Sequence, residues 1–240
     1  PFDLESADYL NNFQSIFKIS SGDNNFVQLI DKVFSFNKPT IISTGLADIQ
    51  LLENIYRCWG EMKPSFPLSF LHCVSSYPVP DDQANINAIK YMMENFPHAI
   101  IGYSDHTIGD ESVCAAVSIG AKIIEKHFTL DKNFSDFRDH QLSSDPEELK
   151  LIVNKIRKIE KLLGQDIKAP QKCEEDIRKS LRRSIAAAKD LNVNHKICLE
   201  DLVWVRPGTG LNPGQENLLI GKQTNREIKM GEIIFPEMAR

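Results

Sequence analysis

Two histidines, His106 and His127, each follow an apolar run of strand length, in the segments 102–107 (GYSDHT) and 125–129 (EKHFT). Because side chains alternate between the faces of a strand, Ser104 shares a face with His106, and Glu125 shares one with His127. Neutral imidazole is a common ligand of divalent transition metals, and two such ligands leave positions open for substrate oxygens and water. The pair therefore predicts a catalytic metal site at one end of a sheet. The simpler alternative, that each histidine is a polar residue with its own hydrogen-bond partner, stays open here.

Three more strand-like runs end in residues suited to ligand binding. Lys18 is the single cation in an apolar and small-residue run, and an interior lysine needs an anionic partner such as a bound phosphate or carboxylate. The hydroxyl of Ser43 arrives where a strand turns into a helix, and Gly45 lets a ligand approach the backbone there, as at a phosphate site. Ser75 and Tyr77 share a face, which favours a sugar site. A solvated lysine, ordinary turn chemistry and aromatic packing are the alternatives.

With 240 residues, 42% hydrophobic and 25% charged, the chain has the composition of a soluble globular protein. Its net charge of -5 without basic clusters gives no electrostatic footprint for nucleic acid. No apolar run approaches the ~20 residues that a membrane span needs. Five scattered cysteines without a CxxC pair predict reduced thiols and a cytoplasmic location. Cys73, inside an apolar run, is interpreted as a buried small hydrophobe.

Short apolar runs alternate with helical periodicity over the first two thirds of the chain, which predicts parallel strands joined by right-handed crossovers. Strands are expected at 16–20, 40–44, 68–75, 99–103 and 122–127, and helices at 24–36, 48–59, 82–95, 111–119 and 146–163. An eight-stranded (β/α) barrel typically takes ~250 residues, so these five strands would be its later part. A five-stranded open α/β sheet is the alternative, and it places functional residues at the same strand ends.

The pattern changes near residue 165. We expect residues 1–166 to form the C-terminal part of a barrel domain, 167–180 a linker with a short helix, and 181–240 a small β-rich domain. This last part holds a weak repeat, in which 189–197 (KDLNVNHKI) resembles 226–234 (REIKMGEII). Asn194 and Gly231 fall at matching positions, and these residue types best tolerate positive φ in a tight turn.

The chain also resembles a known family over nearly its whole length and in the right order. The segments that carry the resemblance are 18–22 (KISSG), 42–45 (ISTG), 72–78 (HCVSSYP), 102–107 (GYSDHT) and 124–131 (IEKHFTLD). They are similar to the sialic acid synthase family, which comprises N-acetylneuraminate synthases and their legionaminate and pseudaminate relatives. Segments 183–184 (RS), 205–210 (VRPGTG) and 220–222 (IGK) resemble that family's C-terminal antifreeze-like (SAF) domain.

The resemblance implies an α/β fold, a (β/α)8 TIM barrel that lacks its first strands in this chain and is followed by the SAF domain. It implies condensation of phosphoenolpyruvate with N-acetylmannosamine or a related N-acyl amino sugar, which yields a nine-carbon 2-keto acid and releases phosphate. His106 and His127 would hold a divalent metal, usually Mn2+, with Mg2+ or Co2+ as alternatives, and Glu125 would orient a ligand or relay a proton.

The same resemblance assigns the remaining site residues. The phosphate and carboxylate of phosphoenolpyruvate would be held by Lys18, Ser21, Ser43, Ser75 and Ser104, and the amino sugar by Asp23, Tyr77 and Asp139. Arg206 would cap the active site of a neighbouring subunit, which implies a domain-swapped homodimer. The alternative for Arg206 is a surface arginine before a Pro-Gly turn.

Three departures from the family pattern matter. Its first barrel strands should precede Pro1, so we predict a fragment of a longer enzyme that is unstable or inactive by itself. The family commonly has Gly-Pro-Asp where this chain reads Phe137-Arg138-Asp139, and Asp23 replaces a frequent glutamate. Both changes bear on which sugar fits. The rival hypotheses are another metal-dependent oxo-acid lyase or aldolase, and an inactive sugar-binding module.

Overall fold

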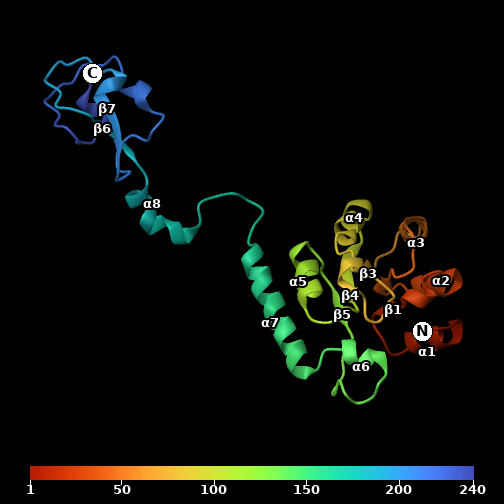
Figure 1. Cartoon of the computed structure of the whole chain (residues 1–240). Helices are drawn as coiled ribbons and strands as arrows, with labels where there is room; N and C mark the ends of the chain where they lie inside the picture. Colours follow the sequence, from red (N-terminus) through yellow and green to blue (C-terminus); the bar gives the residue numbers. More distant parts are fainter. The chain divides into compact units, whose positions relative to one another are not determined.

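The computed structural model describes all 240 residues, which divide into two compact units, Pro1–Gln165 and Asp166–Arg240 (Figure 1). Unit 1 contains one five-stranded parallel sheet in the order β1-β2-β3-β4-β5. Its strands are β1 (Phe17–Ile19), β2 (Thr40–Ser43), β3 (Leu68–Cys73), β4 (Ile100–Asp105) and β5 (Ile124–Lys126). The five expected strands are therefore present, although β4 and β5 end one residue before His106 and His127.

The sheet of unit 1 is strongly curved. In a flat sheet, β1 and β5 would lie roughly 19 Å apart, since neighbouring strands are spaced by about 4.8 Å. Nevertheless the Nζ atom of Lys18 on β1 lies 3.1 Å from a carboxylate oxygen of Glu125 on β5. Sequential strand order with right-handed crossovers also places the connecting helices on one side of the sheet. Curvature and order together describe a parallel half-barrel and not a flat, doubly wound sheet.

Helices α1 to α7 belong to unit 1, and the longer ones begin at clear capping residues. Their bounds are α1 (Leu4–Asn11), α2 (Val27–Ser35), α3 (Ile49–Glu61), α4 (Ala88–Asn95), α5 (Glu111–Ser118), α6 (Arg138–Leu142) and α7 (Pro146–Leu163). The side chain of Asp48 caps α3, and Asp145 with Glu148 forms a capping box at the start of α7. The short helices α1 and α6 were not expected from the sequence. None of the helices combines the length and apolar character that a membrane crossing requires.

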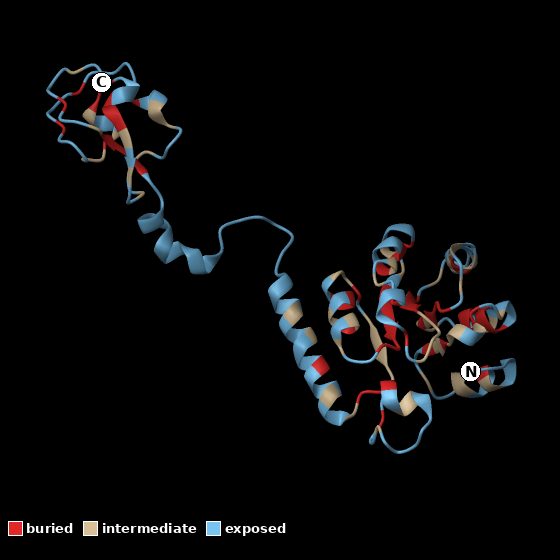
Figure 2. Ribbon diagram, viewed as in Figure 1, coloured by how far each residue is buried: buried red, intermediate tan, exposed pale blue.

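The core of unit 1 lies between the strands and the helices around them (Figure 2). Phe17, Ile42, Leu68 and Phe70 on the first three strands are completely buried, and every residue of β3 is buried. His72 on β3 belongs to this layer, because its Nε2 atom lies 2.9 Å from the carbonyl oxygen of Ala84. Its interpretation as a structural residue on the face opposite Ser75 is thus consistent with its contacts.

Unit 2 is built largely from turns around a small apolar core. It contains the helix α8 (Glu175–Leu181) and one antiparallel pair, β6 (Ser184–Ala187) with β7 (Leu202–Val205). The expectation of a β-rich domain was too strong, since other pairings are isolated bridges. The expected positive φ at the two matching turn positions is confirmed, since Asn194 and Gly231 have φ of 63° and 82°. The two halves meet where Leu191 and Ile228 exchange backbone hydrogen bonds.

A buried carboxylate organises the turns of unit 2. Asp201 is completely buried; its Oδ1 atom forms an ion pair with the Lys189 ammonium at 2.8 Å, and its Oδ2 atom accepts a hydrogen bond from the backbone N–H of Cys198 at 2.9 Å. The Nε2 atom of His195 lies 2.7 Å from the same carboxylate. His195 was assigned no role from the sequence, but it has this structural one. These contacts hold the pKa of Asp201 below its usual range, although burial alone would raise it.

Candidate active site

The imidazoles of His106 and His127 face each other at the carboxyl ends of β4 and β5. Their ring centroids are 5.1 Å apart and the rings are nearly perpendicular. Tyr77, in the loop after β3, lies against both, with ring centroids 4.3 Å from His106 and 5.7 Å from His127. Two histidines that are distant in the sequence thus meet at one end of the sheet, as the sequence predicted. Neither ring is sealed into the core by a carboxylate.

The hydrogen bonds of His106 leave one ring nitrogen free for a metal. Its Nδ1 atom lies 2.9 Å from the carbonyl oxygen of Val74, which can only accept, so Nδ1 carries the proton and Nε2 keeps its lone pair. This is the arrangement expected of a metal-binding imidazole. No group of three or more His, Cys, Asp or Glu side chains forms a complete metal cage. Two imidazoles therefore fit an open, catalytic metal site better than a structural one.

The two histidines have opposite pKa shifts. Burial alone would lower the pKa of His106, but the Cys73 thiol and the Val74 carbonyl outweigh it and raise the pKa. The pKa of His127 is lowered, first by burial and then by the positive charge of His106 nearby. His127 therefore favours the neutral form that a metal requires.

Glu125 connects three strands across the site. One of its oxygens accepts a hydrogen bond from the Ser104 hydroxyl at 2.7 Å, and the other lies 3.1 Å from Lys18 Nζ. Ser104 and Glu125 are direct partners in the β4 and β5 register. The sequence indicated that Lys18 needs an anionic partner, and a strand at the other edge of the curved sheet supplies a carboxylate for it. The lysine nevertheless remains a third exposed, with its charge directed into the site.

Small hydroxyls gather around the turn after β2. The backbone N–H of Gly45 donates to Ser21 Oγ at 3.1 Å, and a side chain at Gly45 would collide with Ser75 Oγ. Ser43 is buried and its hydroxyl has no hydrogen-bond partner. The Asn24 amide holds the turn by donating to the carbonyl oxygens of Ser43 and Gly45. Such a set of hydroxyls can hold a small anion, although the backbone of Gly45 itself is buried.

Cys73 lies between the serine hydroxyls and the histidine pair and contacts both. Its buried sulfur lies 3.5 Å from Ser21 Oγ and 3.8 Å from His106 Nδ1. Burial alone would raise the pKa of this thiol, but contacts with His106 and Ser21 lower it. Its interpretation as a small hydrophobe accounted for its burial and missed these polar contacts. The sequence signal was its place two residues before Ser75 on the same strand face.

The two acidic residues expected to bind sugar are far apart in the sequence, Asp23 in the turn after β1 and Asp139 in α6. Asp23 accepts a hydrogen bond from the hydroxyl of Ser20 in the turn after β1. Asp139 lies in α6, beside Arg138, whose guanidinium carbon stands 5.1 Å from the ring centroid of Tyr77. Arg138 was not among the sequence-predicted site residues, although its departure from the family pattern marked it. Arg138, the neighbour of Asp139 in α6, thus brings the start of this helix to the Tyr77 ring.

Arg206 belongs to unit 2, where its Nε atom donates to the carbonyl oxygen of Leu181 at 3.0 Å. Together with the Gly208 N–H, which donates to the Lys179 carbonyl at 2.7 Å, it caps the last turn of α8. The other two nitrogens of the Arg206 guanidinium are not used in these contacts. The expectation that they reach a neighbouring subunit stays a prediction.

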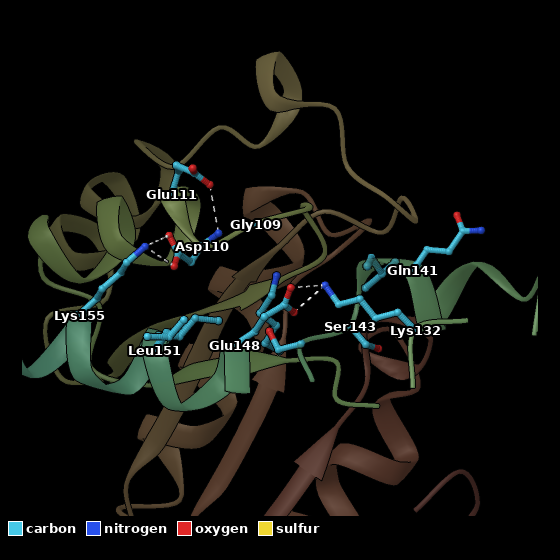
Figure 3. Close-up of a pocket in the computed structure, with 13 residues that line it drawn as sticks. Gly109, Asp110, Glu111, Lys132, Gln141, Ser143, Glu148, Leu151 and Lys155 are labelled. Atoms are coloured by element: carbon cyan, nitrogen blue, oxygen red, sulfur yellow. Dashed lines mark hydrogen bonds and ion pairs between the residues drawn. The ribbon is translucent and has the colours of Figure 1, made fainter. Parts of the chain in front are cut away.

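A separate cavity of about 240 Å³ holds none of the predicted site residues (Figure 3). It opens on the opposite face of β5 from Glu125 and is lined by Lys126, whose Nζ atom forms a buried ion pair with Asp105 at 2.6 Å. Two further cations that line it are also paired, Lys155 with Asp110 and Lys132 with Glu148, as Figure 3 shows. These pairs tie the loops after β4 and β5 to α7.

A curved parallel sheet with imidazoles, hydroxyls and an ammonium–carboxylate pair at the carboxyl ends of its strands defines an α/β enzyme. The model of the NeuB family matches residues 1–168, and that of the SAF domain matches residues 182–240. The N,N'-diacetyllegionaminic acid synthase of Campylobacter jejuni is 37% identical over 98% of this chain and 70% of its own length. The N-acetylneuraminate-9-phosphate synthase of Mus musculus is 32% identical over 92% of this chain and 61% of its own length.

Among solved structures, the N-acetylneuraminic acid (sialic acid) synthetase of Leptospira borgpetersenii, in complex with citrate, has a TM-score of 0.68 and 34% identity. That similarity covers 75% of this chain and 64% of the other. The chain belongs to the NeuB family and carries a SAF domain. The resemblance inferred from the sequence is confirmed, and the protein is an enzyme of the sialic acid synthase class.

Proposed function

We propose that this protein condenses phosphoenolpyruvate with an N-acyl amino sugar of the N-acetylmannosamine type. The products are a nine-carbon 2-keto acid and inorganic phosphate. The observation that carries the proposal is the convergence of His106 and His127, 5.1 Å apart, beside the Lys18–Glu125–Ser104 chain in a NeuB-family protein. The histidine pair suits the sugar aldehyde, which is the electrophile, and Lys18 suits the anionic phosphoenolpyruvate.

His106 and His127 are the residues that would hold a divalent metal, with Mn2+ as the first choice and Mg2+ or Co2+ as alternatives. When bound there, such an ion supplies Lewis-acid polarisation of the sugar aldehyde. The free Nε2 of His106 and the lowered pKa of His127 support this assignment. His106 and His127 are thus proposed as both metal ligands and catalytic residues.

The anionic donor is held by charge and hydroxyl groups. Lys18 binds its phosphate or carboxylate, together with the hydroxyls of Ser21, Ser43, Ser75 and Ser104. The unpartnered hydroxyl of Ser43 and the close packing of the Ser21 and Ser75 hydroxyls beside Gly45 support this role. The sugar is held by Asp23, next to the donor group, and by Tyr77 and Asp139. Each residue thus stays in the role that the family motif assigned.

In the reaction, the electrons of the C2–C3 double bond of phosphoenolpyruvate form a bond from C3 to the aldehyde carbon. The aldehyde oxygen takes a proton and becomes a hydroxyl, and C2 is left electron-poor. Water adds to C2, and a carboxylate oxygen of Glu125 takes its proton. Phosphate then leaves from C2 with the electrons of the C–O bond, and it takes the proton of the C2 hydroxyl as the 2-keto group forms. Lys18 and Ser104 orient the Glu125 carboxylate for this step through contacts of 3.1 and 2.7 Å.

The remaining assignments complete the proposal. The half-barrel of unit 1 is part of a (β/α)8 barrel, and the enzyme works as a domain-swapped homodimer in which Arg206 reaches the partner's active site. It acts in the cytoplasm. The curvature that joins β1 to β5 supports the barrel, and the two unused guanidinium nitrogens of Arg206 support an external contact.

Phosphate release tests the proposed reaction. The enzyme is incubated with phosphoenolpyruvate, Mn2+ and candidate amino sugars, and phosphate and the nine-carbon product are measured by colorimetry and mass spectrometry. Phosphate should appear only when both substrates are present, and His106→Ala or His127→Ala should abolish it. Phosphate release without a nine-carbon product would indicate another lyase, and sugar binding without turnover would indicate a binding module.

A further inference from the structure

Arg138 is a cation at the outer end of the histidine and tyrosine cluster. Its guanidinium carbon lies over the face of Tyr77 at 5.1 Å, and Tyr77 contacts both His106 and His127. The family pattern commonly places proline at this position, so the guanidinium is a feature of this chain and was not required by the proposed reaction.

The charge of Arg138 is only weakly compensated within the protein. Its nearest carboxylate is that of Asp139, which approaches Nε at 3.9 Å, the outer limit of an ion pair, and the Arg138 side chain is 62% exposed. No hydrogen bond engages either terminal nitrogen. Stacking on an aromatic ring holds the plane of a guanidinium while its two outer N–H groups remain available for a bidentate contact.

The loop that carries Arg138 is braced on both sides. The hydroxyl of Thr129 lies 2.9 Å from His140 Nδ1, and Lys132 pairs with Glu148 at 2.6 Å. The start of α6 falls at Arg138 itself, so its backbone is part of a regular turn. The backbone that carries the guanidinium is therefore held beside Tyr77 by these contacts and not left in a free loop.

The distance from Arg138 to the histidines matches the length of an acceptor sugar. The stacked contacts place the guanidinium within roughly 10 Å of the His106 ring. An extended six-carbon sugar spans about 6 Å between its end carbons, and a terminal phosphate adds about 3 Å. A sugar with its aldehyde at the histidine pair can thus present its far end to Arg138.

We propose that Arg138 selects acceptor sugars that carry an anionic group, such as a phosphate, at the end of the chain remote from the aldehyde. The inference rests on the proposed function, because it takes the aldehyde to lie at His106 and His127. The planar fork and the absence of a close carboxylate partner favour a bidentate contact with such a group over a neutral hydroxyl.

Acceptor preference tests this role. Initial rates are measured with N-acetylmannosamine and with N-acetylmannosamine 6-phosphate for the wild type and Arg138→Gln. We expect the wild type to prefer the phosphorylated acceptor, and the substitution to lower its kcat/KM by about 10- to 100-fold. The rate with the neutral acceptor and the KM for phosphoenolpyruvate should change little. A wild-type preference for the neutral sugar, or an equal loss with both sugars, would overturn the inference.

Two further variants separate the contact from a structural effect. Arg138→Pro restores the common family residue at the first position of a helix, where proline is tolerated, and should reproduce the Arg138→Gln preference. Arg157→Gln removes an exposed arginine of α7 that already pairs with Glu160, and should leave the preference unchanged. An altered preference in Arg157→Gln would contradict the assignment to Arg138.

Binding measured without turnover keeps this inference distinct from the proposed reaction. Calorimetry with N-acetylmannosamine 6-phosphate and Mn2+ should give a Kd about tenfold or more weaker for Arg138→Gln than for the wild type. Equal Kd values would refute the role of Arg138 even if the reaction proceeds. A weaker Kd without phosphate release in any assay would refute the proposed reaction and retain the anion contact.

Discussion

A substitution at Gly45 would directly disturb the serine hydroxyls that we assign to phosphoenolpyruvate binding. A Cβ atom at this position would collide with Ser75 Oγ and lie 2.8 Å from Ser21 Oγ. The backbone of Gly45 is not in the left-handed region, so alanine can adopt it without strain. The effect of Gly45→Ala should therefore come from the displaced hydroxyls alone.

The size of the effect follows from these contacts. Ser21 Oγ must withdraw by about 0.6 Å to reach ordinary van der Waals distance, which weakens its hydrogen bond from Gly45 N–H. Overpacking of this kind should lower the free energy of unfolding by about 1–3 kcal/mol. Loss of one hydroxyl contact to a charged ligand should raise the KM for phosphoenolpyruvate by about 10- to 100-fold.

The assay is steady-state phosphate release, combined with urea unfolding of the same samples. Gly60→Ala is a matched control, because a Cβ there meets no atom within 4 Å and Gly60 lies within α3. That variant should keep the wild-type KM and gain about 0.5–1 kcal/mol of stability. An unchanged KM for phosphoenolpyruvate in folded Gly45→Ala would refute the assignment of Ser21 and Ser75 to the donor.

Three further outcomes are expected. Lys126→Met leaves the Asp105 carboxylate buried without its cation, so urea denaturation should show a loss of about 3–5 kcal/mol; a loss below 1 kcal/mol would contradict this. Mn2+ affinity measured by titration calorimetry should fall as pH decreases, because protons compete for His106, whose pKa is raised; pH-independent affinity would exclude imidazole ligands. Since the pKa of Asp201 is lowered, its stabilisation is present above the unfolded value of about 3.9 and is lost as pH falls below it. In acid unfolding followed by circular dichroism, Asp201→Asn should flatten this loss, and an unchanged acid profile would contradict it.

Local pattern was sufficient to predict the elements that position the site. The apolar runs and the period-2 alternation placed Ser104 beside His106 and Glu125 beside His127, and parallel strands bring such ends to one edge. The positive φ of Asn194 followed from residue type at a turn. These features depend on neighbours in the sequence, which is why one sequence is enough to predict them.

Contacts that depend on curvature and loop paths were not predictable in this way. Lys18 and Glu125 meet only because the sheet curls, and no local pattern encodes the radius of that curl. Arg138 reaches Tyr77 through the path of the loop after β5, where the sequence has no strong periodicity. The polar contacts of Cys73 were hidden because an apolar run is equally typical of core packing.

The central claim is that His106 and His127 hold a catalytic metal at the carboxyl ends of β4 and β5. Anomalous X-ray scattering from crystals of the enzyme grown with Mn2+ tests it most directly. The account predicts one Mn2+ peak bonded to Nε2 of His106 and to a ring nitrogen of His127, beside Tyr77. A peak at other residues, or none at this pair when Mn2+ supports turnover, would contradict it.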